Sequence, residues 1–274
     1  MDATTALPAT IRHSPTPTGA GIGAAPRGNA SLPLWREAFA GLDRLALRCS
    51  PVYFGAAVPR GDGSPVIIVP GLFASDACLV ELYGWLSRIG CEPHFSGVGL
   101  NPTCPALLLE RLVATVDSVS EETSRKARLV GHSLGGLLAR GAALRRPGKV
   151  AQVITLGSPV HWLAAHPAVL AAGEALHGEY SCDTKSCLQA PPASWISETS
   201  IFTREDGVVD WRTCLHESVG ANIEVSGTHS ALIINANAFE ALGRSLATKT
   251  AEDSQLAESL FGRNSMPVVA PVAA

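Results

Sequence analysis

Residues 131–135 read GHSLG and fit the pattern G-x-S-x-G. In this pattern the serine between the two glycines can act as a nucleophile. A nucleophilic serine on a sharp strand-to-helix turn needs a strained backbone, and flanking glycines leave room for it. The alternative is a glycine-rich helix start with Ser133 as its N-cap. The flanking residues favour the catalytic turn, since 127–131 is strand-like and 134–145 is helix-like. We therefore predict that Ser133 is a nucleophile.

Asp206 is the predicted acid partner of this serine. A serine hydroxyl is a weak nucleophile at neutral pH, so it needs a histidine base and an acid that orients the histidine. On such a turn the partners follow in the order serine, acid, histidine. Asp206 comes after a predicted strand and before a glycine, where α/β sheets place functional groups. Asp210 is its nearest rival and Glu205 the next, and surface or capping charge is their alternative role.

His229 is the predicted base. It lies in the sequence GTHS between the last predicted strand and the last predicted helix, and no other histidine follows His216. The alternative is an exposed loop histidine or a helix cap. His132 is too close to Ser133 along the turn to act as its base. The remaining candidates, His161, His166 and His177, fall in a predicted insertion.

Two backbone N–H groups are predicted to bind the oxyanion that forms when the serine attacks a carbonyl. One belongs to Leu134, the residue after the nucleophile. The other comes from the loop after the first central strand, where Gly71 allows close approach and Leu72 offers the best-placed N–H. Phe73 is the alternative donor, and Pro70 is excluded because proline has no N–H.

Strand-like and helix-like segments alternate along the chain. Apolar runs predict strands at 66–69, 93–98, 127–131, 150–156, 200–203 and 223–225, and helical periodicity predicts helices at 34–47, 76–89, 105–123, 134–145 and 231–246, with Asp76 as a cap. This alternation predicts an α/β fold with a mostly parallel central sheet and helices on both faces. The segment from about 161 to 197 breaks the alternation, and we interpret it as a small lid insertion.

The predicted domain organisation is a flexible N-terminal arm at 1–30, a single α/β domain at 31–261 and a flexible C-terminal tail at 262–274. The two ends are rich in proline, alanine and small polar residues and have no periodicity. Hydrophobic residues make up 46% of the chain and charged residues 16%, which is a globular composition. The sequence therefore predicts one sizeable core.

Charge and hydropathy exclude several classes of partner. The net charge is −3 without a long basic run, so nothing indicates a nucleic-acid or anionic membrane surface. No apolar run reaches the roughly 18 residues of a membrane-spanning helix. Residues 1–19 carry an early Asp2 and no apolar region, unlike a secretory signal peptide. This favours a cytoplasmic location and leaves secretion open.

Seven cysteines leave at least one thiol unpaired, and none of them forms a C-x-x-C pair, so a structural zinc site is not expected. Cys91 with Cys104, and two of Cys182, Cys187 and Cys214, could form disulfides in an oxidising compartment. In a reducing compartment the same residues would be small buried hydrophobes.

Four segments together resemble the α/β-hydrolase superfamily, and more closely its bacterial lipase and esterase branch: VIIVPGLFAS, GHSLGG, TREDGVVDW and GTHSAL, spanning about residues 64–247. The resemblance implies a triad of Ser133, Asp206 and His229, with Leu72 and Leu134 forming the oxyanion hole. The chain differs from many lipases of the family at residues 70–71, where Pro-Gly replaces His-Gly. That difference bears on the shape of the acyl pocket.

The sequence thus predicts a serine-dependent carboxylic-ester hydrolase, lipase or esterase, that acts on a small-molecule or lipid ester and requires no metal or organic cofactor. Apolar residues in the predicted lid, such as Trp162 and Leu170, fit an apolar acyl chain, although they could equally bury the insertion. Three alternatives stay open: an acyltransferase, a polyester depolymerase or thioesterase on the same triad, and an inactive hydrolase fold kept as a binding module.

Overall fold

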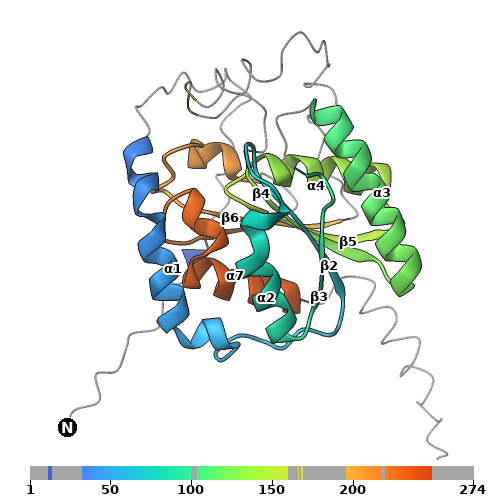
Figure 1. The fold of residues 1–274 in the computed structure, drawn as a ribbon, viewed down its shortest axis with the longest axis horizontal. Helices are drawn as coiled ribbons and strands as arrows, with labels where there is room; N and C mark the ends of the chain where they lie inside the picture. The colour runs from blue at the N-terminus through green and yellow to red at the C-terminus, as the bar shows by residue number, and fades with distance from the viewer. Residues whose placement is uncertain are drawn as a thin grey trace, which may run out of the picture.

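The computed structural model of the 274-residue chain describes residues 12–13, 33–99, 104–159, 166, 168, 196–216 and 220–248. These residues form a sheet of seven strands in the order β1-β7-β6-β5-β4-β2-β3, with helices on both faces (Figure 1). The strands are β1 (Arg12–His13), β2 (Pro65–Val69), β3 (Glu92–Phe95), β4 (Ala127–His132), β5 (Val150–Leu156), β6 (Ser197–Phe202) and β7 (Gly220–Glu224). Every pairing is parallel except that of β1 with β7. The predicted α/β fold with a mostly parallel sheet is confirmed.

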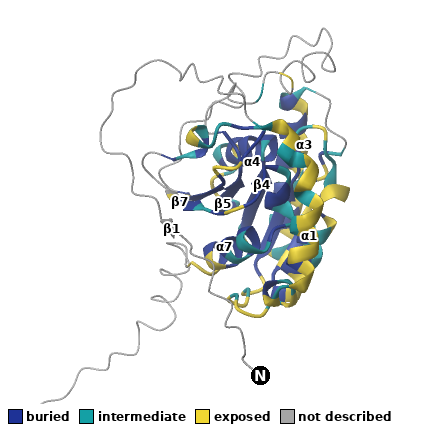
Figure 2. Ribbon diagram, turned by 90° about the vertical axis from the view of Figure 1, so that its left-hand side faces the viewer, coloured by how far each residue is buried: buried dark blue, intermediate teal, exposed yellow. Residues whose placement is uncertain are grey.

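The helices cover the sheet in two layers. They are η1 (Leu34–Phe39), α1 (Ala40–Cys49), η2 (Pro51–Phe54), η3 (Asp76–Leu79), α2 (Val80–Ile89), α3 (Pro105–Thr123), α4 (Leu134–Arg145), η4 (Trp211–Cys214), η5 (Ser230–Ile233) and α7 (Ala236–Ala247), where η marks a 3-10 helix. Residues of α1, α2 and α7 share one of the two large apolar cores, and residues of α3 and α4 share the second. Figure 2 shows buried strands between helices whose outer faces are exposed.

Strand β2 shows why the sheet needs both layers. All five of its residues are buried. Because successive strand side chains point to opposite faces, Val66 and Ile68 pack into the core with α1, α2 and α7, while Ile67 and Val69 pack into the core with α3 and α4. A continuous β-branched run is the sequence pattern of such a doubly covered parallel strand.

Several predicted boundaries differ from the structure in their details. The helix predicted at 34–47 is a 3-10 turn followed by α1, and the one predicted at 231–246 is η5 followed by α7, which Asn235 caps through two backbone N–H groups. Asp76 is wrong as a cap: its carboxylate instead accepts hydrogen bonds from the backbone of Ser96 and Gly97 and from the Ser96 hydroxyl. Tertiary contacts at the end of β3 therefore determine the position of this side chain.

The chain ends and the insertion are described only in part. Arg12 and His13, within the predicted arm, pair with Ile223 and Glu224 of β7. Of the predicted lid at 161–197, the structure describes 166, 168, 196 and 197, and the His166 N–H donates to the Val208 carbonyl at 2.6 Å. The rest of the lid and the tail at 262–274 lie outside the described residues, so the predicted domain boundaries and the lid stay predictions.

The cysteines correct one predicted pairing. Cys104 is disulfide-bonded, whereas Cys49, Cys78, Cys91 and Cys214 are free thiols. A bond between Cys91 and Cys104 is therefore wrong. Cys91 lies in the core beside α2, and burial raises the pKa of its thiol to about 11. It packs as a small apolar side chain.

Candidate active site

Ser133 stands at the turn between β4 and α4 with φ 53° and ψ −122°. This conformation is strained for a residue with a Cβ atom, and such strain persists where the surrounding structure enforces it. The Ser133 N–H donates to the Leu156 carbonyl at 2.9 Å, which ties the turn to the end of β5. The side chain is half-buried, although β4 and the first turns of α4 are buried throughout. The turn therefore lifts one polar side chain out of the core.

The two glycines of the pentapeptide are required by close packing. A Cβ atom on Gly131 would overlap the backbone of Gly135, and a Cβ atom on Gly135 would overlap the carbonyl oxygen of Val69. The turn thus lies directly against the end of β2. This close packing is the steric reason why both flanking positions of the G-x-S-x-G pattern are glycine.

Asp206 and His229 come together at the same edge of the sheet. Asp206 follows β6 and His229 follows β7, and these neighbouring parallel strands end side by side. His229 Nδ1 lies 2.7 Å from Asp206 Oδ2. Because a carboxylate can only accept, the Nδ1–H donates, which leaves Nε2 with its lone pair. Both side chains are buried.

The other oxygen of Asp206 is also occupied. Asp206 Oδ1 accepts from the backbone N–H groups of Val208 at 2.8 Å and Val209 at 2.7 Å. The two rivals make other contacts: Asp210 accepts from the Arg212 N–H at the start of η4, and Glu205 accepts from the Gly227 N–H. Of the three acids, Asp206 is the one that contacts His229. The backbone donors hold its carboxylate in a fixed orientation.

His132 connects the serine turn to the histidine loop. Its Nε2 donates to the His229 carbonyl at 3.0 Å, and the two rings lie 4.7 Å apart between centres. Burial, followed by the proximity of His229, lowers the pKa of His132 to about 3. His132 is therefore neutral and supports the His229 loop. Among the described residues, no hydrogen bond joins Ser133 Oγ to His229 Nε2, a contact that in free enzymes is often long until substrate binds.

Gly157 makes space for the acid–histidine pair. It follows β5 with φ +57°, and a Cβ atom there would lie 3.2 Å from His229 Nδ1 and 3.3 Å from Asp206 Oδ2. A side chain at this position would press on the hydrogen bond between them. The sequence indicates this role only weakly: Gly157 directly follows the strand predicted at 150–156, at the edge of the sheet where the site residues are predicted.

The predicted oxyanion donors lie on either side of the turn. Leu134 is the first residue of α4, and the first N–H groups of a helix have no partner within it. In the loop after β2, the Ala74 N–H bonds to the Gly71 carbonyl, and Phe73 has φ 61°. A Cβ atom on Gly71 would lie 3.1 Å from Ser133 Cβ, so this loop touches the serine turn. The roles of Leu72 and Leu134 stay predictions.

Glu37 is a residue that the sequence analysis missed. Its carboxylate accepts from the backbone N–H groups of Gly207, His229 and Ser230. Glu37 lies in η1, between 170 and 193 residues before the residues it contacts, so no local pattern could have indicated these contacts. Burial alone would raise its pKa, but hydrogen bonds from Ser230, Gly207 and His229 outweigh burial and lower it.

Comparisons with known proteins bear on the fold. Aspergillus fumigatus lipase B superimposes with a TM-score of 0.54 and 15% identity, over 71% of this chain and 55% of that chain. The chain has the α/β-hydrolase fold. The predicted superfamily resemblance is thereby confirmed at the level of the fold.

Further comparisons found partial similarity in sequence and in structure. The sequence model of the family described as "PGAP1-like alpha/beta domain" matches residues 106–170, which include Ser133. Lipase BlEst2 of Bacillus licheniformis in its mature form gives a TM-score of 0.47 and 18% identity, over 65% of this chain and 89% of that chain. Alpha/beta hydrolase domain-containing protein 10 from mouse gives 0.46 and 17%, over 73% and 92%. No curated protein sequence matches the chain.

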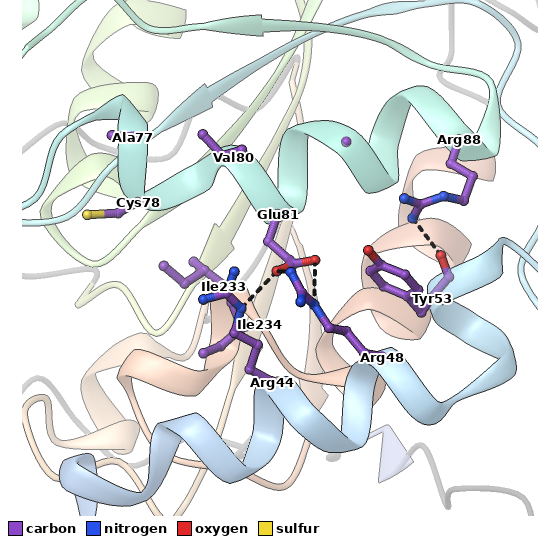
Figure 3. Close-up of a pocket in the computed structure, with 11 residues that line it drawn as sticks. Arg44, Arg48, Tyr53, Ala77, Cys78, Val80, Glu81, Arg88, Ile233 and Ile234 are labelled. Atoms are coloured by element: carbon purple, nitrogen blue, oxygen red, sulfur yellow. Dashed lines mark hydrogen bonds and ion pairs between the residues drawn. The ribbon is translucent and has the colours of Figure 1, made fainter.

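A groove on this α/β-hydrolase fold has a volume of about 460 Å³ and lies between α1, α2, η2 and η5 (Figure 3). Its charged groups bind one another: Arg44 and Arg48 both bond to Glu81, and Arg88 lies over the ring of Tyr53. None of Ser133, Asp206 and His229 lines it. The groove is therefore separate from the candidate active site.

The described ranges hold neither a metal-binding cluster nor a helix that could span a membrane. Within them, no group of three or more His, Cys, Asp or Glu side chains is arranged to hold a metal ion. None of the helices in that part of the chain is long and apolar enough to cross a membrane.

Proposed function

We propose that the protein is a serine-dependent carboxylic-ester hydrolase, of the lipase or esterase type, that acts through an acyl-enzyme on Ser133. The observation that carries this proposal is the convergence of a strained serine turn after β4 and a buried Asp206–His229 pair after β6 and β7 at one edge of the sheet. A serine, a histidine and an acid in this arrangement form the triad that activates a hydroxyl for acyl transfer.

In the proposed reaction, Ser133 Oγ attacks the ester carbonyl while His229 Nε2 takes the hydroxyl proton. Asp206 holds the ring with Nδ1 protonated and stabilises the imidazolium that forms. The N–H groups of Leu72 and Leu134 stabilise the tetrahedral oxyanion. His229 then protonates the leaving alcohol and activates a water molecule, which hydrolyses the acyl-enzyme and restores Ser133. No metal or organic cofactor takes part.

The test is hydrolysis of p-nitrophenyl esters, from acetyl to palmitoyl, by the parent chain and by Ser133→Ala. A matched control is Ser87→Ala, which changes an exposed serine on α2. We expect activity in the parent and the control and a loss of at least about 1,000-fold in Ser133→Ala. The chain-length profile then separates esterase from lipase.

Labelling with a fluorophosphonate, a reagent for activated serine hydroxyls, gives a second readout that is independent of the ester chosen. Hydrolysis that persists in folded Ser133→Ala would refute the assignment of the nucleophile. A parent chain that neither hydrolyses any ester nor reacts with the fluorophosphonate would refute the proposed function and favour an inactive binding module.

A further inference from the structure

The carboxylate of Glu37 joins the two loops that carry the acid and the histidine. Glu37 Oε1 accepts from the Gly207 N–H at 3.0 Å and from the His229 N–H at 3.1 Å, and Oε2 accepts from the Ser230 N–H at 2.7 Å. Gly207 directly follows Asp206. One oxygen atom thus bonds to the backbone next to the acid and to the backbone of the histidine itself.

A carboxylate suits this position because all three partners are donors. Each carboxylate oxygen can accept more than one hydrogen bond, whereas an amide in the same place offers one acceptor oxygen and an NH₂ group that only donates. Glutamine at position 37 would therefore turn a donor toward at least one backbone N–H. The low pKa of Glu37 means that the carboxylate keeps its charge, and hydrogen bonds to a charged acceptor are about twice as strong as neutral ones.

Besides the Asp206–His229 hydrogen bond itself, two side-chain hydrogen bonds join the loops. The Thr203 hydroxyl donates to the Gly227 carbonyl at 2.6 Å, and Glu205 accepts from the Gly227 N–H at 3.3 Å. Both links lie at the beginning of the histidine loop. Glu37 acts further along, at His229 and Ser230, where the direction of the imidazole is determined.

The segment that carries Glu37 is itself anchored. Asp43, one turn into α1, accepts from the Asn235 side chain at 2.6 Å, and Asn235 caps α7. A side chain can fix the relative position of two loops only when its own segment is held rigidly.

We propose that Glu37 is a positioning residue for catalysis, which holds the loops of Asp206 and His229 at the separation that their hydrogen bond requires. This rests on the proposed function, because it assigns a role in the same reaction. Glu37 touches neither substrate nor the reacting atoms and acts through His229. An element that precedes the sheet's central strands thereby becomes part of the active-site support.

The experiment compares Glu37→Gln with Glu81→Gln in the full chain. Glu81 is a matched control, because its carboxylate also accepts hydrogen bonds, from Arg44 and Arg48, and within the described part of the chain it is hydrogen-bonded to neither loop. Two readouts are used on variants shown by urea unfolding to be folded: kcat and KM for p-nitrophenyl butyrate, and the low-field proton NMR signal of the Asp206–His229 hydrogen bond, assigned by its loss in His229→Ala.

We expect Glu37→Gln to lower kcat roughly 10- to 100-fold with little change in KM, the scale of loss that follows a small misplacement of catalytic groups. The low-field signal should broaden or disappear in Glu37→Gln and persist in Glu81→Gln. If Glu37→Gln does not fold, Glu37→Asp, one methylene shorter, takes its place and should lose activity in the same direction.

A folded Glu37 variant that keeps kcat within about twofold of the parent and retains the low-field signal would overturn the proposal. A purely structural role would lower the stability of Glu37→Gln and leave both kcat and the low-field signal unchanged. Failure of the proposed function looks different, since the parent would then hydrolyse no ester while the NMR signal still distinguished Glu37→Gln from Glu81→Gln.

Discussion

The ring of His132 packs against the ring of His229, with 4.7 Å between centres, and its Nε2 donates to the His229 carbonyl. The residue before the candidate nucleophile thus supports the candidate base. Because His132 is buried and donates through one nitrogen, the neutral imidazole fits the site and the charged form does not. Its pKa is lowered to about 3, and this ties the stability of the site to pH.

The first prediction concerns this pH dependence. Folded His132 stays neutral down to about pH 3, whereas the unfolded chain takes up a proton near the ordinary value of 6.5. The stabilisation is therefore complete above pH 6.5 and is lost as the pH falls toward 3. In His132→Gln, which does not titrate, the free energy of unfolding should fall less steeply with decreasing pH, by up to about 1.4 kcal/mol per pH unit.

Urea unfolding at several pH values between about 4 and 7 measures this difference. His216, whose pKa burial lowers to about 4, contributes a similar slope in both proteins, so the difference between the two curves isolates His132. Parallel curves would contradict the prediction.

The second prediction separates Asp206 from its rival. Asp206→Asn removes the acceptor that holds His229 Nδ1–H, and an amide there favours the wrong tautomer. We expect kcat to fall by about 10⁴-fold, the loss found when Asn replaces the acid of a Ser-His-Asp triad in a serine protease. Asp210→Asn alters only the start of η4 and should leave kcat nearly unchanged. Ester hydrolysis by both variants decides between them, and equal losses would reassign the acid.

Much of the fold is predictable from local patterns. The run Val66–Val69 and the periodicity of 105–123 each specify an element by the faces it buries, and both appear in the structure as β2 and α3. Ser133, Asp206 and His229 are predictable as site candidates because each follows a strand, and parallel strands end at one edge.

Contacts between distant segments are not predictable in this way. Glu37 lies on a helical stretch with no motif of its own, and its proposed role depends on loops that lie 170 to 193 residues away. Asp76 is of a residue type that often caps helices, yet its carboxylate accepts hydrogen bonds from Ser96 and Gly97, which follow β3. In both cases tertiary packing decides which polar group a side chain meets, and no local spacing encodes it.

The third prediction concerns the glycines of the serine turn. Gly135→Ala would place a Cβ atom against the carbonyl of Val69, so the turn must move or the protein must unfold. We expect a loss of stability of about 3 kcal/mol or more together with loss of activity. Gly84→Ala is the control, since a Cβ atom there meets nothing within 4 Å on α2. It should stabilise the protein by about 0.5–1 kcal/mol, because alanine favours the helix.

The fourth prediction concerns a buried ion pair outside the active site. Arg140 on α4 lies 3.3 Å from Glu198 on β6, and His216 lies 3.2 Å from the same carboxylate oxygen. All three side chains are buried. Burial raises the pKa of Glu198 although Arg140 opposes this. His216 is neutral near pH 7, so Arg140 is the cation that compensates the carboxylate.

Arg140→Met should therefore destabilise the protein by about 3–5 kcal/mol, because it leaves a buried carboxylate without its cation. The double variant Arg140→Met/Glu198→Gln should recover part of that loss, since the uncompensated charge is gone. Arg146→Met, which breaks a half-buried pair with Asp117, should lower the unfolding midpoint much less, because water still reaches both charges. Urea unfolding of the parent, the two single variants and the double variant measures their free energies of unfolding. A double variant less stable than Arg140→Met would mean that the carboxylate stabilises the fold through contacts other than the arginine.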